Sequence, residues 1–244
     1  MGSTCGPDPA GLGKNLTRGD RQCQNGRVAK VWKWIAAILL LPACVGAGHA
    51  LWRLLWASGG VTTVWMPLLC GAACWLVIFL LLPRPMWLYV FGHELTHALW
   101  VWLCGGRVKR FRVSPRGGQV VASKVNWCIA LAPYFFPVYV VLVLLVFGIG
   151  HWLWGWGRHL EWLHLFLGAA YAFHVTLTWE ALKTEQTDIT SQGWLFSAVI
   201  IFLGNAAVLL LGLPLLTGEV SLGRVLGWWL EDTAAVWRWL SRVL

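Results

Sequence analysis

Charged residues are scarce in this sequence. Asp, Glu, Lys and Arg together form 12% of its 244 residues, and hydrophobic residues form 58%. Soluble globular domains contain roughly a quarter charged residues. The shortage of charge excludes an ordinary soluble domain and predicts an all-α polytopic membrane protein.

Acidic residues are the scarcer charged class, with 10 against 19 basic residues and a formal net charge of +9. A positive net charge is compatible with binding to nucleic acid or to anionic lipid. Here the basic residues lie in short flanks and loops beside apolar runs, so we expect membrane lipids as partners and no nucleic acid. Many of the 20 tryptophans lie near the ends of those runs, as in interfacial aromatic belts.

The cysteines also lack the short spacings that are typical of metal-binding or disulfide-bonded pairs. No C-x-x-C pair occurs among the seven cysteines, and most of them lie in apolar runs. This pattern supports neither a thiolate zinc site nor a disulfide framework. Residues 1–30 lack any apolar stretch and are rich in Gly and basic groups, so we expect a disordered basic tail and no cleaved signal peptide.

Long apolar runs separated by Gly, Pro and polar breaks predict about six transmembrane helices. Two of them fall in 31–82 and precede the breaker Pro-Arg-Pro. The other four fall in 83–216, the expected membrane core. Residues 217–244 mix acids and arginines with Trp and Leu, which predicts an amphipathic interfacial helix.

One apolar run, 86–104, contains the sequence GHELTHAL at 92–99. On a helix His93 and His97 share a face one turn apart and can bind one metal, with Glu94 beside them to act on a water. This motif also arises by chance in soluble helices, where the acid is solvated. Glu94 is the only acid of an apolar run, and an ionisable cluster at membrane depth is costly, so the metal site is favoured.

The polar segment that follows, 107–124, alternates apolar and basic residues around a Ser-Pro-Arg-Gly-Gly turn. This pattern predicts a short membrane-associated β-hairpin directly after the motif helix. A solvated, charged loop accounts for most of its six basic residues. They are Arg107, Lys109, Arg110, Arg112, Arg116 and Lys124.

A catalytic zinc takes three protein ligands and keeps one open position. Asp188 qualifies as the third ligand because the polar break 183–192 is expected on the side of the membrane where the motif helix ends. His174 qualifies too. It lies about eight residues from the end of its helix and His97 about seven from the end of its own, which gives similar depths at roughly 1.5 Å per residue.

The stretch from about Pro83 to Gly212 resembles the site-2 protease clan of intramembrane zinc metalloproteases, in its compact bacterial branch without a PDZ domain. The matching segments are GHELTH at 92–97, GGRV at 105–108, Asn126 with LAPYFFP at 131–137, and QTDI at 186–189 followed by Gly193. In that clan a β-hairpin after the metal helix helps to hold the substrate strand, and a later helix supplies an Asp ligand. The clan's usual Gly after this Asp is replaced by Ile189.

The resemblance implies an enzyme that hydrolyses peptide bonds of transmembrane protein substrates, in a bacterial cytoplasmic (inner) membrane. His93, His97 and Asp188 would bind Zn2+ and Glu94 would activate the zinc-bound water. His174 would be the alternative third ligand, or a residue that contacts a ligand without binding the metal. Asn126 is a candidate to hold substrate backbone. Alternatively, Asn126 caps the N-terminus of the helix that follows it.

Two other functions stay open at this point. One is a non-proteolytic membrane scaffold or binding protein that retains a metal site, although a structural zinc does not need Glu94. The other is a zinc hydrolase of lipid-linked or small substrates, which the basic hairpin would suit. Orientation is also open, because three predicted crossings separate the basic N-terminal flank from the basic hairpin. The cytosolic-side active site of the clan favours a hairpin on the cytoplasmic side.

Overall fold

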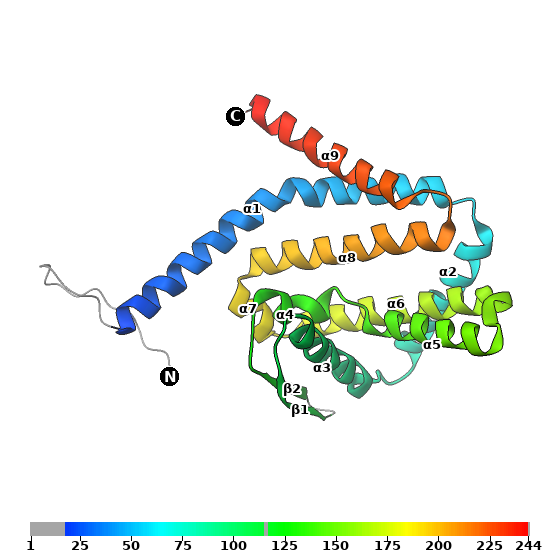
Figure 1. Cartoon of the computed structure of the whole chain (residues 1–244), viewed down its shortest axis with the longest axis horizontal. Coiled ribbons are helices and arrows are strands. Elements are labelled where there is room, and N and C mark those ends of the chain that lie inside the picture. The colour runs from blue at the N-terminus through cyan, green and yellow to red at the C-terminus, as the bar shows by residue number, and fades with distance from the viewer. Residues whose placement is uncertain (1–17, 115–116, 244) are drawn as a thin grey trace, which may run out of the picture.

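The computed structural model describes residues 18–114 and 117–243 and is almost wholly helical (Figure 1). Its elements, in chain order, are α1 Arg18–Ser58, α2 Thr62–Leu81, α3 Met86–Leu103, β1 Val108–Ser114, β2 Gly117–Ala122, α4 Trp127–Leu131, α5 Val138–Trp154, α6 Leu160–Leu182, α7 Thr187–Gln192, α8 Trp194–Thr217 and α9 Leu222–Val243. Short 3-10 turns follow α4 at Ala132–Tyr134 and α5 at Trp156–His159.

The helices form two groups, which Figure 1 shows one above the other. In the first group α1 packs against α8 and α9, around a core of small and branched side chains that includes Ala47, Leu54 and Leu210. In the second group α6 packs against α2 and α5, and α3 lies over the hairpin. The short helices α4 and α7 contact each other and α8, so they join the two groups.

Two glycines allow α2 and α6 to cross with their backbones in contact. A Cβ at Gly71 would lie 1.8 Å from the carbonyl oxygen of Leu165, and one at Gly168 would lie 1.9 Å from that of Leu68. Small residues at such crossings let membrane helices gain van der Waals contact along their length. The α2–α6 pair is therefore a close-packed support for the second group.

Replacing Gly168 by Ala is expected to destabilise the protein, because the added methyl group must push α2 and α6 apart. Overpacking of a well-packed interior costs about 1–3 kcal/mol. The measurement is thermal unfolding in detergent, with Gly148→Ala as the control. A Cβ at Gly148 in α5 meets nothing within 4 Å. Equal unfolding temperatures for the two variants would contradict the close crossing.

The number of membrane spans differs from the prediction. Within the described ranges, three helices are long and apolar enough to cross a membrane, namely Lys30–Ser58, Thr62–Leu81 and Trp194–Thr217, and a bent helix pair makes up to four. The count of about six is not confirmed. Helices α3 and α6 are not among these spans, and both contain acidic and imidazole side chains, which lower mean hydropathy.

The bent pair is the run that the sequence predicts as one span interrupted by two prolines. Residues Trp127–Tyr134 and Val138–Trp154 meet at 74°. Pro133 lies in the 3-10 turn and Pro137 caps α5, so neither residue needs a backbone hydrogen that it lacks. The break turns the chain toward α3 and α7.

The N-terminal prediction is partly wrong. We expect an irregular tail over residues 1–30, whereas α1 begins at Arg18. Residues 1–17 lie outside the described part of the chain. Extension of an existing helix adds one hydrogen bond per residue without a new nucleation cost, and no proline interrupts 18–30.

The C-terminal segment is the expected helix, α9. It packs along α1, where Asp232 lies 2.9 Å from Nδ1 of His49 and 3.5 Å from the guanidinium of Arg53. Val225 is fully buried in the core shared by α1, α8 and α9. The apolar face of α9 is therefore covered in part by the protein itself.

Candidate metal centre

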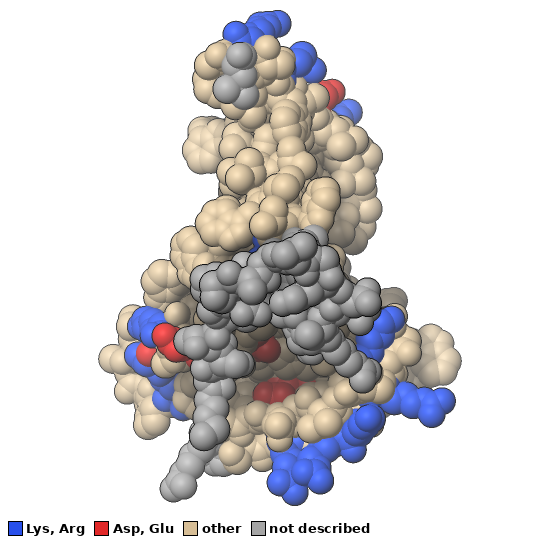
Figure 2. Space-filling view, turned by 90° about the vertical axis from the view of Figure 1, so that its left-hand side faces the viewer, with Lys and Arg blue, Asp and Glu red and all other residues tan. Residues whose placement is uncertain are grey.

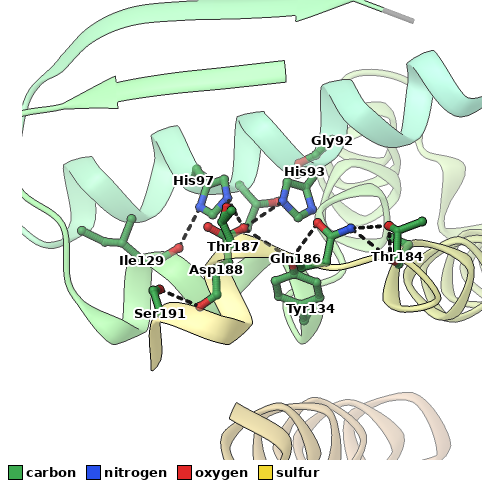
Figure 3. A network of polar contacts seen from close by, with 12 residues as sticks. Gly92, His93, His97, Ile129, Tyr134, Thr184, Gln186, Thr187, Asp188 and Ser191 are labelled. Carbon is green, nitrogen blue, oxygen red and sulfur yellow. Dashed lines mark hydrogen bonds and ion pairs between the residues drawn. The ribbon is translucent and has the colours of Figure 1, made fainter. Parts of the chain in front are cut away.

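The two histidines of the motif lie on one face of α3, as their spacing requires. Their ring centroids are 4.9 Å apart. Both side chains point away from the hairpin toward α7, as Figure 3 shows. Gly92 lets α3 approach α5 closely, because a Cβ there would lie 2.6 Å from the ring of Tyr139.

Asp188 reaches the histidines from α7. Its Oδ2 lies 3.6 Å from Nε2 of His93 and 3.4 Å from Nε2 of His97. Across the described residues, these three side chains form the group of potential metal ligands, with one atom from each within 4.8 Å of the others. Segments about 90 residues apart in the sequence therefore meet at one point.

The distances from Asp188 to the two histidines fit zinc. Zinc lies about 2.0–2.2 Å from nitrogen and oxygen ligands, so a tetrahedral site separates its ligand atoms by roughly 3.3–3.6 Å. His97 is also held in a suitable tautomer, because its Nδ1 lies 2.8 Å from the carbonyl oxygen of Ile129. A proton donated there leaves Nε2 with a free lone pair facing Asp188.

Asp188 is an anion at neutral pH. Burial raises the pKa of its carboxyl group, but the adjacent imidazoles of His93 and His97 lower it more and hold it well below its usual range. A carboxylate ligand must be deprotonated to bind a metal. The environment of Asp188 therefore favours the form that a metal requires.

The residue after Asp188 is Ile189. Ile189 lies within the helix α7, and its backbone is not in the left-handed region. Its side chain packs in the cluster that includes Ala37 and Leu131. Lys33 of α1 donates a hydrogen bond of 2.7 Å to Gln192 Oε1, at the end of α7. The helix that carries Asp188 is thus fixed by α1 and α4.

Glu94 lies beside the histidines and is 8% exposed. It lines a cavity of about 560 Å³ together with the three candidate ligands and residues of β2. A Cβ at Gly118 of β2 would lie 2.3 Å from Cγ of Glu94. The missing side chain at Gly118 therefore lets the hairpin approach the carboxylate closely.

The sequence did not single out Tyr134 as a positioning residue. It is fully buried, and its hydroxyl lies 3.3 Å from Asp188 Oδ2 and 3.4 Å from Gln186 Oε1. Its ring packs edge-on against His93 at 5.3 Å. Tyr134 therefore contacts candidate ligands from both α3 and α7, and only its place in the motif LAPYFFP could have drawn attention to it.

Replacing Tyr134 by Phe is expected to weaken zinc binding by about 10-fold or more, because Asp188 loses a hydrogen-bond donor that orients it. The ring and its packing stay. The measurement is competition with a chromogenic chelator. Tyr171→Phe, on α6 and away from the cavity, is the control. An unchanged affinity in Tyr134→Phe would contradict the orienting role.

The other two candidates lie elsewhere. His174 is buried in α6 and does not join the ligand group formed by the described residues. Asn126 caps α4, because its Oδ1 accepts a hydrogen bond of 2.8 Å from the amide of Ile129. The structure therefore shows the capping role of Asn126.

The expected β-hairpin is present. Strands β1 and β2 pair antiparallel, with Phe111 opposite Val120 and Val113 opposite Gly118. Phe111 packs edge-on against Phe91 of α3, while Lys109, Arg110 and Arg112 are exposed. Figure 2 shows basic side chains along the lower edge of the molecule, where the hairpin lies, and acidic side chains in a hollow above them.

Comparison with known families agrees with this geometry. The model of the Peptidase M50B-like family matches residues 67–138, which include the motif helix and the hairpin. This part of the chain is similar to the site-2 protease family. Searches of curated proteins and of solved structures found no match.

The matched stretch is similar to peptidases of the M50 type, whose members are generally zinc-dependent. The long apolar helices, together with this similarity, indicate an integral membrane protein. The family match ends at residue 138. Asp188 therefore lies outside it, and its assignment as a ligand depends on the geometry described above.

Proposed function

We propose that this protein is an intramembrane zinc metalloprotease that hydrolyses peptide bonds of membrane-embedded protein substrates. The observation that carries the proposal is the convergence of His93, His97 and Asp188 beside Glu94, in one cavity of a helical membrane protein. The three side chains would hold Zn2+. When bound, zinc would polarise the scissile carbonyl and lower the pKa of a bound water.

Glu94 is the general base in this proposal. Its carboxylate lines the cavity, and no described residue forms an ion pair or a hydrogen bond with it. It is therefore free to take the proton of the attacking water and to donate it to the leaving amine. A structural metal site would not need such a group.

The hairpin would hold the substrate in an extended form. A transmembrane substrate must unwind locally, because a helix satisfies its own backbone groups and shields its carbonyls. Strand β2 contributes Gly117, Gly118, Gln119 and Val120 to the cavity wall. An unwound segment can add to the edge of this two-stranded sheet by backbone hydrogen bonds.

The family resemblance and the basic hairpin support a bacterial cytoplasmic membrane, with the hairpin on its cytoplasmic side. Lys109, Arg110 and Arg112 have no ion-pair partner within the described residues. Anionic lipid headgroups attract basic residues in this position. Membrane lipids are therefore the second partner in this proposal.

The experiment places the purified protein in proteoliposomes with a pool of single-span membrane peptides and maps the product termini by mass spectrometry. We expect cleavage within the apolar part of a peptide, its loss with a zinc chelator, and its return when zinc is added back. Peptides cut only outside their apolar segments, or cleavage that the chelator leaves unchanged, would contradict the proposal.

A further inference from the structure

The two histidines of the metal centre differ in how their second ring nitrogen is bonded. Nδ1 of His97 lies 2.8 Å from the carbonyl oxygen of Ile129. Nδ1 of His93 is buried and has no hydrogen-bond partner among the described residues. A metal-bound histidine nearly always donates this second N–H to a carboxylate, a carbonyl or a water, which fixes the orientation of the ring. His93 therefore needs an acceptor that no nearby side chain of the described chain supplies directly.

His93 also lines a second, small cavity. It has a volume of about 20 Å³ and is formed by α3, α5, α6 and the turn at Pro133. One water needs roughly 10–15 Å³ of such volume and two to four polar partners. The cavity has the size of a single water site.

His174 lines the same cavity from α6. It is 8% exposed, and its Nε2 is also buried without a hydrogen-bond partner in the described ranges. Two unpartnered imidazole nitrogens thus belong to side chains that line one water-sized cavity. A buried polar atom without a partner is unfavourable, so both nitrogens favour a bridging molecule.

Three side chains in the cavity wall carry a hydroxyl group. That of Tyr89 is buried without a hydrogen-bond partner among the described residues, whereas those of Thr96 and Tyr139 already donate their protons to backbone carbonyls. Thr96 Oγ1 donates its proton to the carbonyl oxygen of Gly92 at 2.8 Å. The Tyr139 hydroxyl donates its proton to the carbonyl oxygen of Leu88. Both hydroxyls therefore offer only lone pairs to the cavity, and they can accept a hydrogen bond from a water there.

We propose that a buried water in this cavity links Nδ1 of His93 to Nε2 of His174, and that His174 is a positioning residue for the metal centre. Nδ1–H of His93 donates to the water oxygen, and the water donates to Nε2 of the neutral His174. This arrangement leaves the lone pair of His93 Nε2 toward Asp188. The inference rests on the proposed function only in that His93 is taken as a metal ligand.

The test measures zinc affinity of the detergent-purified full chain by chelator competition, without any activity assay. His174→Leu removes the acceptor and is expected to weaken zinc binding by about 10–100-fold. His174→Gln places an amide oxygen near the position of Nε2 and is expected to recover most of the affinity. His174→Phe replaces the Leu variant if the latter does not purify as a folded protein.

His164→Leu is the matched control. His164 is on the same helix, is 7% exposed, and also has a buried ring nitrogen without a partner in the described part of the chain. It does not line the cavity. Zinc affinity in His164→Leu is expected to equal that of the wild type. An equal loss in His164→Leu and His174→Leu, or no rescue by Gln, would overturn the positioning role.

This result is separable from the fate of the proposed function. Wild-type affinity in His174→Leu overturns the inference and leaves the protease proposal standing. Zinc binding that depends on His174 as described, in a protein that cleaves no peptide, supports the inference and contradicts the protease proposal.

Discussion

Replacing Glu94 by Gln is expected to lower the rate of peptide hydrolysis by about 10²–10⁴-fold, the usual contribution of a general acid–base group. Gln has nearly the same shape as Glu, but it cannot take a proton from water. Glu94 is not one of the three candidate ligands, so zinc content is expected to stay at the wild-type level. The measurements are initial rates in proteoliposomes and zinc per chain on the same preparation.

Glu161→Gln is the control for this experiment. Glu161 begins α6 and its side chain is 60% exposed, so the same change in charge is made far from the cavity. Its rate is expected to equal that of the wild type. Full activity in Glu94→Gln would contradict the role of Glu94 as the base. Loss of zinc together with activity would show that Glu94 acts on the metal site instead.

Replacing Gly118 by Ala is expected to lower the turnover rate by about 10²-fold without loss of zinc. The new methyl group would lie 2.3 Å from Cγ of Glu94, so either the carboxylate or the hairpin must move. A displacement of about 1 Å in a catalytic group can cost about 10²-fold in rate. The measurement is the turnover rate at saturating peptide substrate.

Arg112→Ala is the control for the hairpin. Arg112 lies on β1, one residue before the partner of Gly118, and its side chain is exposed. A wild-type turnover rate in Arg112→Ala and a reduced one in Gly118→Ala would locate the effect at Glu94. Equal rates in the two variants would show that the close approach of β2 has no catalytic consequence.

The local features of the site were predictable from the sequence. The i, i+4 spacing of His93 and His97 places both rings on one helix face, whatever the rest of the chain does. The alternation in 107–124 and its Gly-Gly turn predicted the hairpin, which the structure confirms. The capping role of Asn126 followed from its place before a helix.

The long-range features were not predictable in the same way. Counting residues along a helix gives the depth of a side chain in the membrane but not the direction in which it points. Both Asp188 and His174 were therefore possible third ligands. The structure brings Asp188 to the histidines through α7, whereas His174 lies behind His93. Gly118 and Tyr134 act through contacts across more than 20 residues, so no local pattern marks them.

The span count was overestimated for a related physical reason. The ionisable residues that make α3 a candidate site also make it a poor match to a purely apolar span. The hairpin and α4 pack against this helix, as the contacts of α3 show. Neighbouring elements decide whether such a helix is stable in a membrane, and a hydropathy pattern does not contain them.

The most direct test of the account is the zinc content of the detergent-purified protein by elemental analysis, beside Asp188→Ala and Glu185→Ala. Glu185 is an exposed acid three residues before Asp188 and does not line the site cavity. The account predicts about one zinc per chain in the wild type and in Glu185→Ala, and a large loss in Asp188→Ala. No zinc in the wild type, or full zinc in Asp188→Ala, would contradict the metal centre of His93, His97 and Asp188.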